Sequence, residues 1–288
     1  MTSCRSAETA PPRPPQWNAL LPGTDFRWQM SLRPGDGGHF FTPTPDTDLF
    51  LEERRRWLMT HPREFVAALP ESFALVEEAV AMISRWLGEN RRPAACSDVT
   101  EAEALCFAGG IKWEPDWVLL RPDEAGTFRL VAGVVCFPSM WSLREKLGGT
   151  IAEIHNPVAG LNANLGAKID TFLARVKAGQ DWERENWGLS ANNDLNHHPR
   201  FRPAGLTGDS RVDGVWIRLE WQLFSRLPET SGLLFGIRVL HYPLADIASQ
   251  PGIAHRLAQA LTSMPNDVAD YKGLSAAREN LIRELERL

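Results

Sequence analysis

Tyrosine, paired cysteines and long apolar runs are scarce in this chain of 288 residues. It has two tyrosines and four cysteines, and Cys4, Cys96, Cys106 and Cys136 form no C-x-x-C motif. This spacing argues against a disulfide framework and favours a reduced, cytoplasmic protein. No apolar run approaches the roughly 18 residues of a membrane-spanning helix, and the N-terminus lacks the apolar core of a signal peptide. We therefore expect no membrane association.

Excess positive charge and nucleotide-binding motifs are also missing. The formal net charge is −5, which gives no basic footprint for binding nucleic acid. The chain contains no glycine-rich dinucleotide fingerprint after a strand, no Walker-type loop and no G-x-S-x-G motif. It does contain 43% hydrophobic residues, enough for a substantial core. Its eleven tryptophans can fill that core or line a pocket for a flat cofactor.

The pattern of apolar residues predicts an α+β fold with an antiparallel sheet and flanking helices. Residues 1–16 are rich in proline and are expected to be a disordered lead-in to one domain with helical extensions, residues 17–288. Helical periodicity covers residues 48–60, 71–87, 165–177, 252–263 and 274–288. Strand patterns predict two antiparallel hairpins, from 116–121 with 128–137 and from 214–224 with 233–242. This order argues against repeated β-α-β units, which would build a parallel sheet.

The segment FPSMWSLREKLGGTIAEIHNPVAG, residues 137–160, carries the strongest candidate for a functional residue. It follows an apolar strand, and Ser139 or Ser142 is expected to cap the short helix that comes next. A second helical turn brings His155 to a sharp change of direction at Asn156-Pro157. A histidine so constrained suits a metal ligand or a proton-transfer group, although a buried structural histidine is the alternative. The chain offers no partner ligands at zinc spacing, whereas haem iron needs only one histidine.

Aromatic and charged residues near His155 in sequence supply candidates for binding a cofactor. Trp141 adds an aromatic surface to the same segment, and Lys146 is either a surface lysine, which we favour, or a partner for an acidic group. In the RENW motif, Arg184 could clamp an acidic cofactor group while the indole of Trp187 stacks on a ring. The alternatives are an exposed charge at a helix end and a core tryptophan.

The predicted strand 216–222 supplies the candidates for catalysis. Its period of two places Arg218, Glu220 and Gln222 on one face. From the pattern alone we favour a solvated face, which is the commoner arrangement. The alternative is a pocket wall, where Glu220 recognises an amine or moves protons and Arg218 holds a carboxylate. The polar run NNDLNHH, residues 192–198, is interpreted as a flexible loop.

Taken together, these segments resemble the haem-dependent oxidative N-demethylase alpha-subunit-like family. Residues 137–160 are similar to its FPS-W-L-EK-G…IH-PV-G signature, with Ala159 where a second proline is usual. RENWGL, RLEWQLFSRLPETSGLLFGIRVLHYPL and MPNDVADYKGL are similar to later segments of the family. The resemblance covers nearly the whole chain after the lead-in, and a long ordered series of motifs is far more specific than any one of them.

The resemblance implies a PAS-like antiparallel sheet that binds one haem b, with His155 as the axial ligand to iron. It also implies removal of a methyl group from a small secondary amine such as dimethylamine, with consumption of O2 and release of formaldehyde. Electrons would come from NADPH through separate reductase subunits, which would carry any flavin or iron–sulfur cofactor. The motif residues carried over are Arg184 and Trp187 as cofactor-binding candidates, beside Trp141 and Lys146, and Arg218, Glu220 and Gln222 as catalytic candidates.

Two other functions stay open at this point. PAS-like folds often serve as sensors, so the chain could bind haem or another ligand without turnover. It could also be a scaffold subunit that keeps the fold without haem. Formaldehyde release separates the enzyme from the sensor, and an absorption spectrum separates both from the scaffold.

Overall fold

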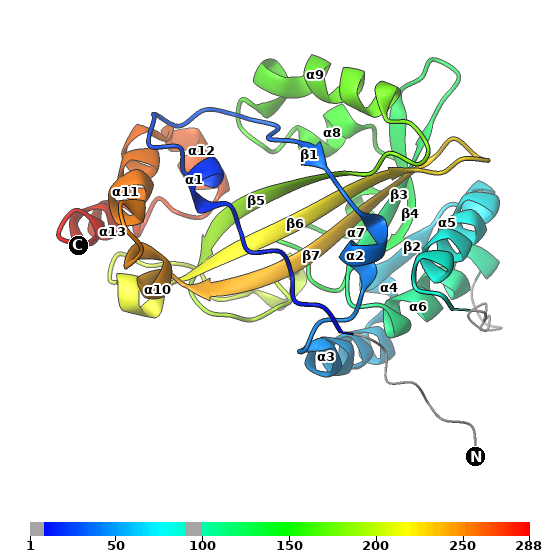
Figure 1. Cartoon of the computed structure of the whole chain (residues 1–288), viewed down its shortest axis with the longest axis horizontal. Helices are drawn as coiled ribbons and strands as arrows, with labels where there is room; N and C mark the ends of the chain where they lie inside the picture. The colour runs from blue at the N-terminus through cyan, green and yellow to red at the C-terminus, as the bar shows by residue number, and fades with distance from the viewer. Residues whose placement is uncertain (1–8, 90–99) are drawn as a thin grey trace.

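The computed structural model describes residues 9–89 and 100–288 and confirms the α+β class (Figure 1). The α-helices of this part of the chain are α1 (Trp17–Leu20), α2 (Gly37–Phe41), α3 (Thr47–Thr60), α4 (Pro62–Phe65), α5 (Phe73–Trp86), α6 (Glu101–Lys112), α7 (Leu143–Lys146), α8 (Ile151–His155), α9 (Leu161–Arg175), α10 (Leu244–Ala248), α11 (Ile253–Ser263), α12 (Asn266–Tyr271) and α13 (Arg278–Leu285). The strands are β1 (Arg33–Pro34), β2 (Val66–Ala68), β3 (Asp116–Pro122), β4 (Phe128–Val134), β5 (Trp182–Ser190), β6 (Trp216–Arg226) and β7 (Leu233–Pro243).

The strands form one antiparallel sheet in the order β1-β5-β6-β7-β3-β4-β2. Both predicted hairpins are confirmed: β3 pairs with β4, and β6 pairs with β7 along their whole length. The strand β5 was not predicted as a strand, and it pairs with β6 over nine residues. An antiparallel sheet with helices on its faces is compatible with the PAS-like architecture that the family resemblance implies.

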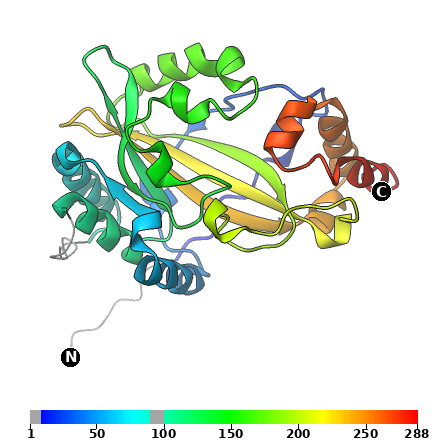
Figure 2. The same ribbon diagram turned by 180° about the vertical axis from the view of Figure 1, so that it is seen from behind.

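Helices cover both faces of this sheet and one end of its long strands (Figures 1 and 2). Helices α8 and α9 lie over one face, where apolar residues of α9 pack against β3, β4 and β7. Helices α2, α3, α5 and α6 contribute to the cluster on the opposite face. The C-terminal helices α10 to α13 pack together beside the ends of β5 and β6. The strands thus lie between layers of helices.

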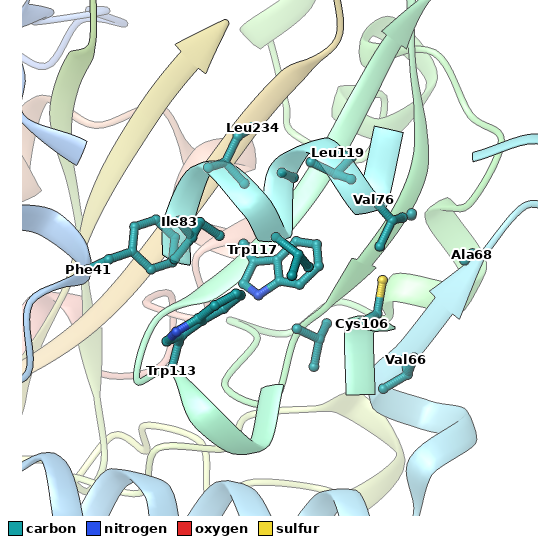
Figure 3. Packing of buried hydrophobic residues seen from close by; sticks show 14 of the residues in the cluster. Phe41, Val66, Ala68, Val76, Ile83, Cys106, Trp113, Trp117, Leu119 and Leu234 are labelled. Atoms are coloured by element: carbon teal, nitrogen blue, oxygen red, sulfur yellow. The ribbon is translucent and has the colours of Figure 1, made fainter. Parts of the chain in front are cut away.

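The largest hydrophobic cluster is built around tryptophan side chains (Figure 3). Trp113 and Trp117 lie at its centre, close to Phe41 and Ile83. The packing is tight enough that a Cβ added at Gly109 would come within 2.9 Å of the Trp113 ring. The tryptophans at this place therefore fill the core rather than line a cofactor pocket.

The cysteines in the described residues are buried and free, which confirms the interpretation of Cys136 as a core residue. Burial, which disfavours the thiolate, raises the pKa of Cys136 to about 12. Such a thiol is a poor nucleophile at neutral pH. Cys4 and Cys96 lie outside the described residues.

A buried ion pair holds the segment that follows β4 and leads into residues 137–160. The Asp116 carboxylate pairs with Arg54, and both side chains are almost completely buried. The same carboxylate accepts hydrogen bonds from the backbone N–H groups of Cys136, at 2.7 Å, and Phe137, at 2.8 Å. Because a buried carboxylate requires such donors, the start of segment 137–160 is tied to the core at a defined position.

The N-terminal lead-in is described only in part, because residues 1–8 lie outside the described residues. Its second half contacts the body of the protein. The N–H of Ala10 donates to the carbonyl of Pro43 at 2.9 Å, and Arg13 lies 3.4 Å from the Glu183 carboxylate on β5. In the described part of the chain, no helix combines the length and the apolar character needed to cross a membrane.

Candidate functional site

The helix α8 delivers His155, as the sequence predicts, and it is fixed at its start by a reciprocal cap. The hydroxyl of Thr150 accepts from the N–H of Glu153 at 3.2 Å, and the Glu153 carboxylate accepts from the N–H of Thr150 at 2.7 Å. After the helix, the N–H of Val158 donates to the carbonyl of His155 at 2.9 Å and closes the turn. This turn forms with Ala159 in place of the second proline. The backbone on both sides of His155 is therefore defined.

The His155 ring is half-buried and has an unpartnered nitrogen. Its Nδ1 is buried and has no hydrogen-bond partner in the described residues. Burial, together with the charges of Arg184 and Lys146, lowers the pKa of His155 to about 4. The ring is consequently neutral at neutral pH, which is the form that binds a metal. Among the described residues, the ring therefore lacks the hydrogen bond at Nδ1 that a structural histidine would make.

Lys146 and Trp141 lie on the same segment as His155. The Nζ of Lys146 donates to the carbonyl of Ile154 at 3.1 Å, and the side chain is half-buried rather than fully exposed. Trp141 is partly buried and packs against the hydrophobic cluster that also contacts Ile154. Both residues thus belong to the packing around α8.

The register of the sheet places five polar residues on one face, called the polar face below: Arg184 and Asn186 of β5, and Arg218, Glu220 and Gln222 of β6. Directly opposite each other are Arg184 and Gln222, then Asn186 and Glu220. Because side chains alternate along a strand, these residues share the face. The preference for a solvated face is wrong, because Arg218 is 5% exposed and Gln222 is 8% exposed.

The carboxylate of Glu220 is held by two neutral donors. The hydroxyl of Ser139 donates to its Oε1 at 2.6 Å, and the Nε2 of Gln222 donates to its Oε2 at 2.8 Å. The sequence predicts Ser139 or Ser142 as the cap of the next helix, and for Ser139 this is wrong. Ser142 occupies the N-cap position of α7 without a side-chain bond, while Ser139 reaches across to β6.

All five N–H donors of Arg218 are used inside the protein. Its Nε donates to the hydroxyl of Ser139 at 2.9 Å, and its Nη1 contacts the Asp194 carbonyl at 3.1 Å and the His241 Nε2 at 3.2 Å. Its Nη2 donates to the carbonyls of Phe137 and Leu195, both at 2.9 Å. This arrangement favours a positioning role for Arg218 over the alternative in which it holds a ligand carboxylate.

Arg184 presents the opposite situation. It lies on the strand β5, so the alternative of an exposed charge at a helix end is wrong. It has no hydrogen bond or ion pair to any described residue, and its Nε is buried. Burial lowers the pKa of Arg184, and the charge of Glu220 opposes this effect. Arg184 is therefore a cation near His155 and Glu220 whose donors are available to a ligand.

Trp187 does not share the face of Arg184. It lies opposite Leu219 in the register, three residues along β5, and packs against the C-terminal cluster. Lys272, which was not predicted as a site residue, contacts Trp187 and interacts electrostatically with Glu220 and Arg184. Its Nζ donates to the Trp187 carbonyl at 2.8 Å and lies 5.6 Å from the centre of the indole. Burial lowers the pKa of Lys272 to about 8, with Glu220 raising it and Arg184 lowering it.

The run 192–198 is more ordered in its contacts than a flexible loop implies. Asn196, His197 and His198 are buried, and His197 forms an isolated parallel bridge with Ser139. No group of three or more potential ligands among histidine, cysteine, aspartate and glutamate is found in the described ranges. The run therefore supports the site segment and does not itself form a metal centre there.

Two histidines whose pKa is lowered in part by the charge of Arg218 predict a loss of stability in mild acid. Burial and the Arg218 charge lower the pKa of His197 to about 4 and that of His241 to about 3, from an ordinary value of 6.5. Below pH 6.5 these two histidines bind protons in the unfolded chain but stay neutral in the folded protein until the pH is much lower. The free energy of unfolding should thus fall as the pH drops from 6.5 toward 4. The slope is at most about 1.4 kcal/mol per pH unit for each ring, and smaller for the half-buried His241.

Urea unfolding at pH 7.0, 6.0 and 5.0 measures this slope. Replacing His197 with asparagine removes one titrating ring and should make the slope shallower. A free energy of unfolding that is constant over this range would contradict the prediction.

The sequence profile of a known family matches the part of the chain that contains this site. The family is described as haem-dependent oxidative N-demethylase, alpha subunit-like, and the match spans residues 96–282, more than half of the chain. The chain belongs to this family. The match includes α8 and the long strands β5 to β7, and so every residue of the polar face. The family description also implies haem dependence and additional subunits.

The residues of the site fit the haem that the family description implies. His155 offers a neutral imidazole with no protein partner at its buried Nδ1. Arg184 and Lys146 place positive charge near it, and haem carries two carboxylates. A single histidine is sufficient, since the porphyrin supplies the other four nitrogen ligands.

Proposed function

We propose that the chain is the haem-binding oxygenase component of an enzyme that removes a methyl group from a small secondary amine such as dimethylamine. The observation that supports this most is the convergence of His155, Arg184 and Glu220, which come from α8, β5 and β6. A neutral histidine suits iron, and a carboxylate suits a protonated amine. Haem b, when bound, would supply the activation of O2.

The proposed reaction balances with two electrons from outside the chain. One secondary amine, one O2, two electrons and two protons give a primary amine, formaldehyde and water. One C–H bond of the methyl group is oxidised, and the C–N bond then breaks. The sequence contains no recognisable flavin or nicotinamide motif, so the electrons would come from NADPH through a separate reductase subunit.

In this proposal Glu220 is the residue that binds the substrate. Its two oxygens each accept one hydrogen bond from the protein, and a carboxylate has further lone pairs for the N–H groups of an alkylammonium ion. The same carboxylate can take the proton that the amine must lose before its methyl group is oxidised. Gln222 orients the carboxylate from the neighbouring position on the same face.

The test is formaldehyde release from dimethylamine by the haem-loaded protein with NADPH and a reductase. We expect one formaldehyde per O2 consumed, and a drop of about 100-fold or more in the rate for Glu220→Gln. That variant has nearly the same shape but cannot carry the negative charge. Its haem spectrum should be retained, which separates the loss of substrate binding from loss of the cofactor.

The sensor alternative predicts a different pair of results. A sensor would bind haem and shift its spectrum with a ligand, yet it would release no formaldehyde with any electron source. A scaffold subunit would show no haem absorption at all after expression with sufficient iron and haem precursor. Either result would overturn the proposed function.

A further inference from the structure

The hydroxyl of Ser139 lies between two charged side chains of β6. It accepts from the Nε of Arg218 at 2.9 Å and lies 2.6 Å from the Oε1 of Glu220. Arg218 and Glu220 are two residues apart on one strand, whereas Ser139 comes from the segment after β4, 81 residues before Glu220. The contact therefore joins two distant parts of the chain at the proposed substrate carboxylate.

The chemistry of these groups fixes the direction of both hydrogen bonds. A guanidinium can only donate, so the Ser139 oxygen must accept from Arg218. A hydroxyl has one proton, and an ionised carboxylate can only accept, so that proton points to Glu220. The separation of 2.6 Å lies in the range for an O–H donor to a charged carboxylate. Reversing either bond is not possible while both side chains keep their charges.

The backbone holds Ser139 in this place with several contacts. The N–H of Met140 donates to the carbonyl of His197 at 3.1 Å, and the N–H of His197 donates to the carbonyl of Pro138 at 3.2 Å. Met140 adopts a φ of 62°, a conformation that costs energy for a residue with a side chain. Surrounding contacts must maintain this strained turn beside Ser139. Those contacts prevent the hydroxyl from moving away with its loop.

We propose that Ser139 is a positioning residue that orients the Glu220 carboxylate for the substrate amine. Arg218 fixes the serine hydroxyl, the hydroxyl fixes Oε1, and Gln222 fixes Oε2. With both oxygens held, the plane of the carboxylate is set before the amine arrives, which lowers the entropy lost on binding. This inference rests on the proposed function for its substrate, but the hydrogen-bond chain itself does not.

The experiment compares Ser139→Ala with Ser142→Ala in the haem-loaded protein. Both serines belong to the same segment, but only the Ser139 hydroxyl contacts Arg218 and Glu220, and the Ser142 side chain makes no cap bond. Spectral titration with dimethylamine should give a Kd about tenfold higher for Ser139→Ala, the usual loss for a hydrogen bond to a charged group. Ser142→Ala should bind like the wild type, and Ser139→Thr, which keeps a hydroxyl, should restore most of the affinity.

A double replacement shows whether Ser139 acts through Glu220. In a Glu220→Ala background, Ser139→Ala should raise the Kd no further, because the group that it positions is gone. A merely structural serine would instead weaken binding equally in both backgrounds and lower the melting temperature of each. Equal effects in the two backgrounds, or no effect of Ser139→Ala in either, would overturn the proposal.

A second readout separates this proposal from the proposed function. The C–O stretching frequency of the carbon monoxide complex reports on nearby charges and does not require an amine. We expect Ser139→Ala and Glu220→Ala each to shift or broaden this band, with no change for Ser142→Ala. If the wild type neither binds nor oxidises dimethylamine, the proposed function fails while the band still tests the coupling. If the band changes for Glu220→Ala but not for Ser139→Ala, the positioning role fails alone.

Discussion

Replacing His155 with alanine is expected to remove or strongly shift the Soret band of the purified protein. The imidazole is neutral because burial and the charges of Arg184 and Lys146 lower its pKa to about 4. No described residue bonds to its buried Nδ1, so alanine removes no structural hydrogen bond. The fraction of chains that retain haem should fall by about tenfold or more, since even indirect partners of a metal ligand change affinity by that amount.

The matched control is His255→Ala, which removes an exposed histidine from α11. Its Soret band should equal that of the wild type in position and intensity. Free imidazole added to His155→Ala should restore the wild-type spectrum in part, because the cavity left by the side chain accepts the same ligand. An unchanged spectrum in His155→Ala would exclude this histidine as the axial ligand.

The low pKa of His155 also sets the pH range of this interaction. With a pKa of about 4 the ring is half-protonated only near pH 4, so protons compete little for its lone pair at neutral pH. Haem retention should therefore be constant from pH 8 to about pH 5 and decrease as the pH falls through 4. An unperturbed histidine, with a value of 6.5, would already compete with the proton near neutrality.

The sequence predicts the elements whose signals are local. The two hairpins follow from apolar strand patterns with a turn between them, and the position of His155 follows from the short helical turn before it and Asn156-Pro157 after it. These features depend on residues a few positions apart. They could be predicted because backbone preference and side-chain period agree within each short segment.

The strand β5 could not be predicted because its stabilising partners are distant. Its sequence, WERENWGLS, carries charges at positions 183, 184 and 185, a pattern that resembles a polar helix end. In the fold, Glu183 and Glu185 form ion pairs with Arg33 of the neighbouring strand β1, and Arg33 lies 2.7 Å from Glu185. The buried charges of a strand are compensated by residues about 150 positions away, which no local pattern reveals.

The same reason explains why Ser139 and Lys272 were missed as site residues. A serine after proline has the signature of a helix cap, and only the folded sheet places Glu220 within reach of its hydroxyl. Lys272 follows α12, and its contact with Trp187 spans 85 residues. The family segment MPNDVADYKGL includes this lysine, so the resemblance carried a signal that local chemistry did not.

The two arginines of the polar face should differ sharply when each is replaced with methionine. Arg218→Met removes the donor from the Ser139 hydroxyl and from four other acceptors. Buried carbonyls without a donor are costly, and we expect a loss of about 3–5 kcal/mol in the free energy of unfolding. For a chain of this size that corresponds to a decrease of about 10 °C in the melting temperature.

Arg184→Met should have little effect on stability but should change the pKa of His155. Arg184 has no hydrogen bond or ion pair among the described residues, so its melting temperature should stay within about 2 °C of the wild type. Its charge, however, helps to lower the pKa of His155, and that pKa should rise in the variant. NMR titration of the histidine ring in the haem-free protein measures this change. Arg218→Met should lower stability without a comparable rise, because Arg218 is not among the charges that lower the pKa of His155.

These two variants together distinguish a residue that maintains the fold from one that serves the site. If both replacements lower the melting temperature equally, the assignment of Arg184 as a residue that binds a ligand rather than maintains the fold is wrong. If neither does, the five hydrogen bonds of Arg218 contribute little to stability, and its positioning role through Ser139 loses its physical basis. The expected contrast arises because a buried guanidinium stabilises a protein only when its donors are used. Arg218 uses all five within the chain, whereas Arg184 has no hydrogen-bond partner among the described residues.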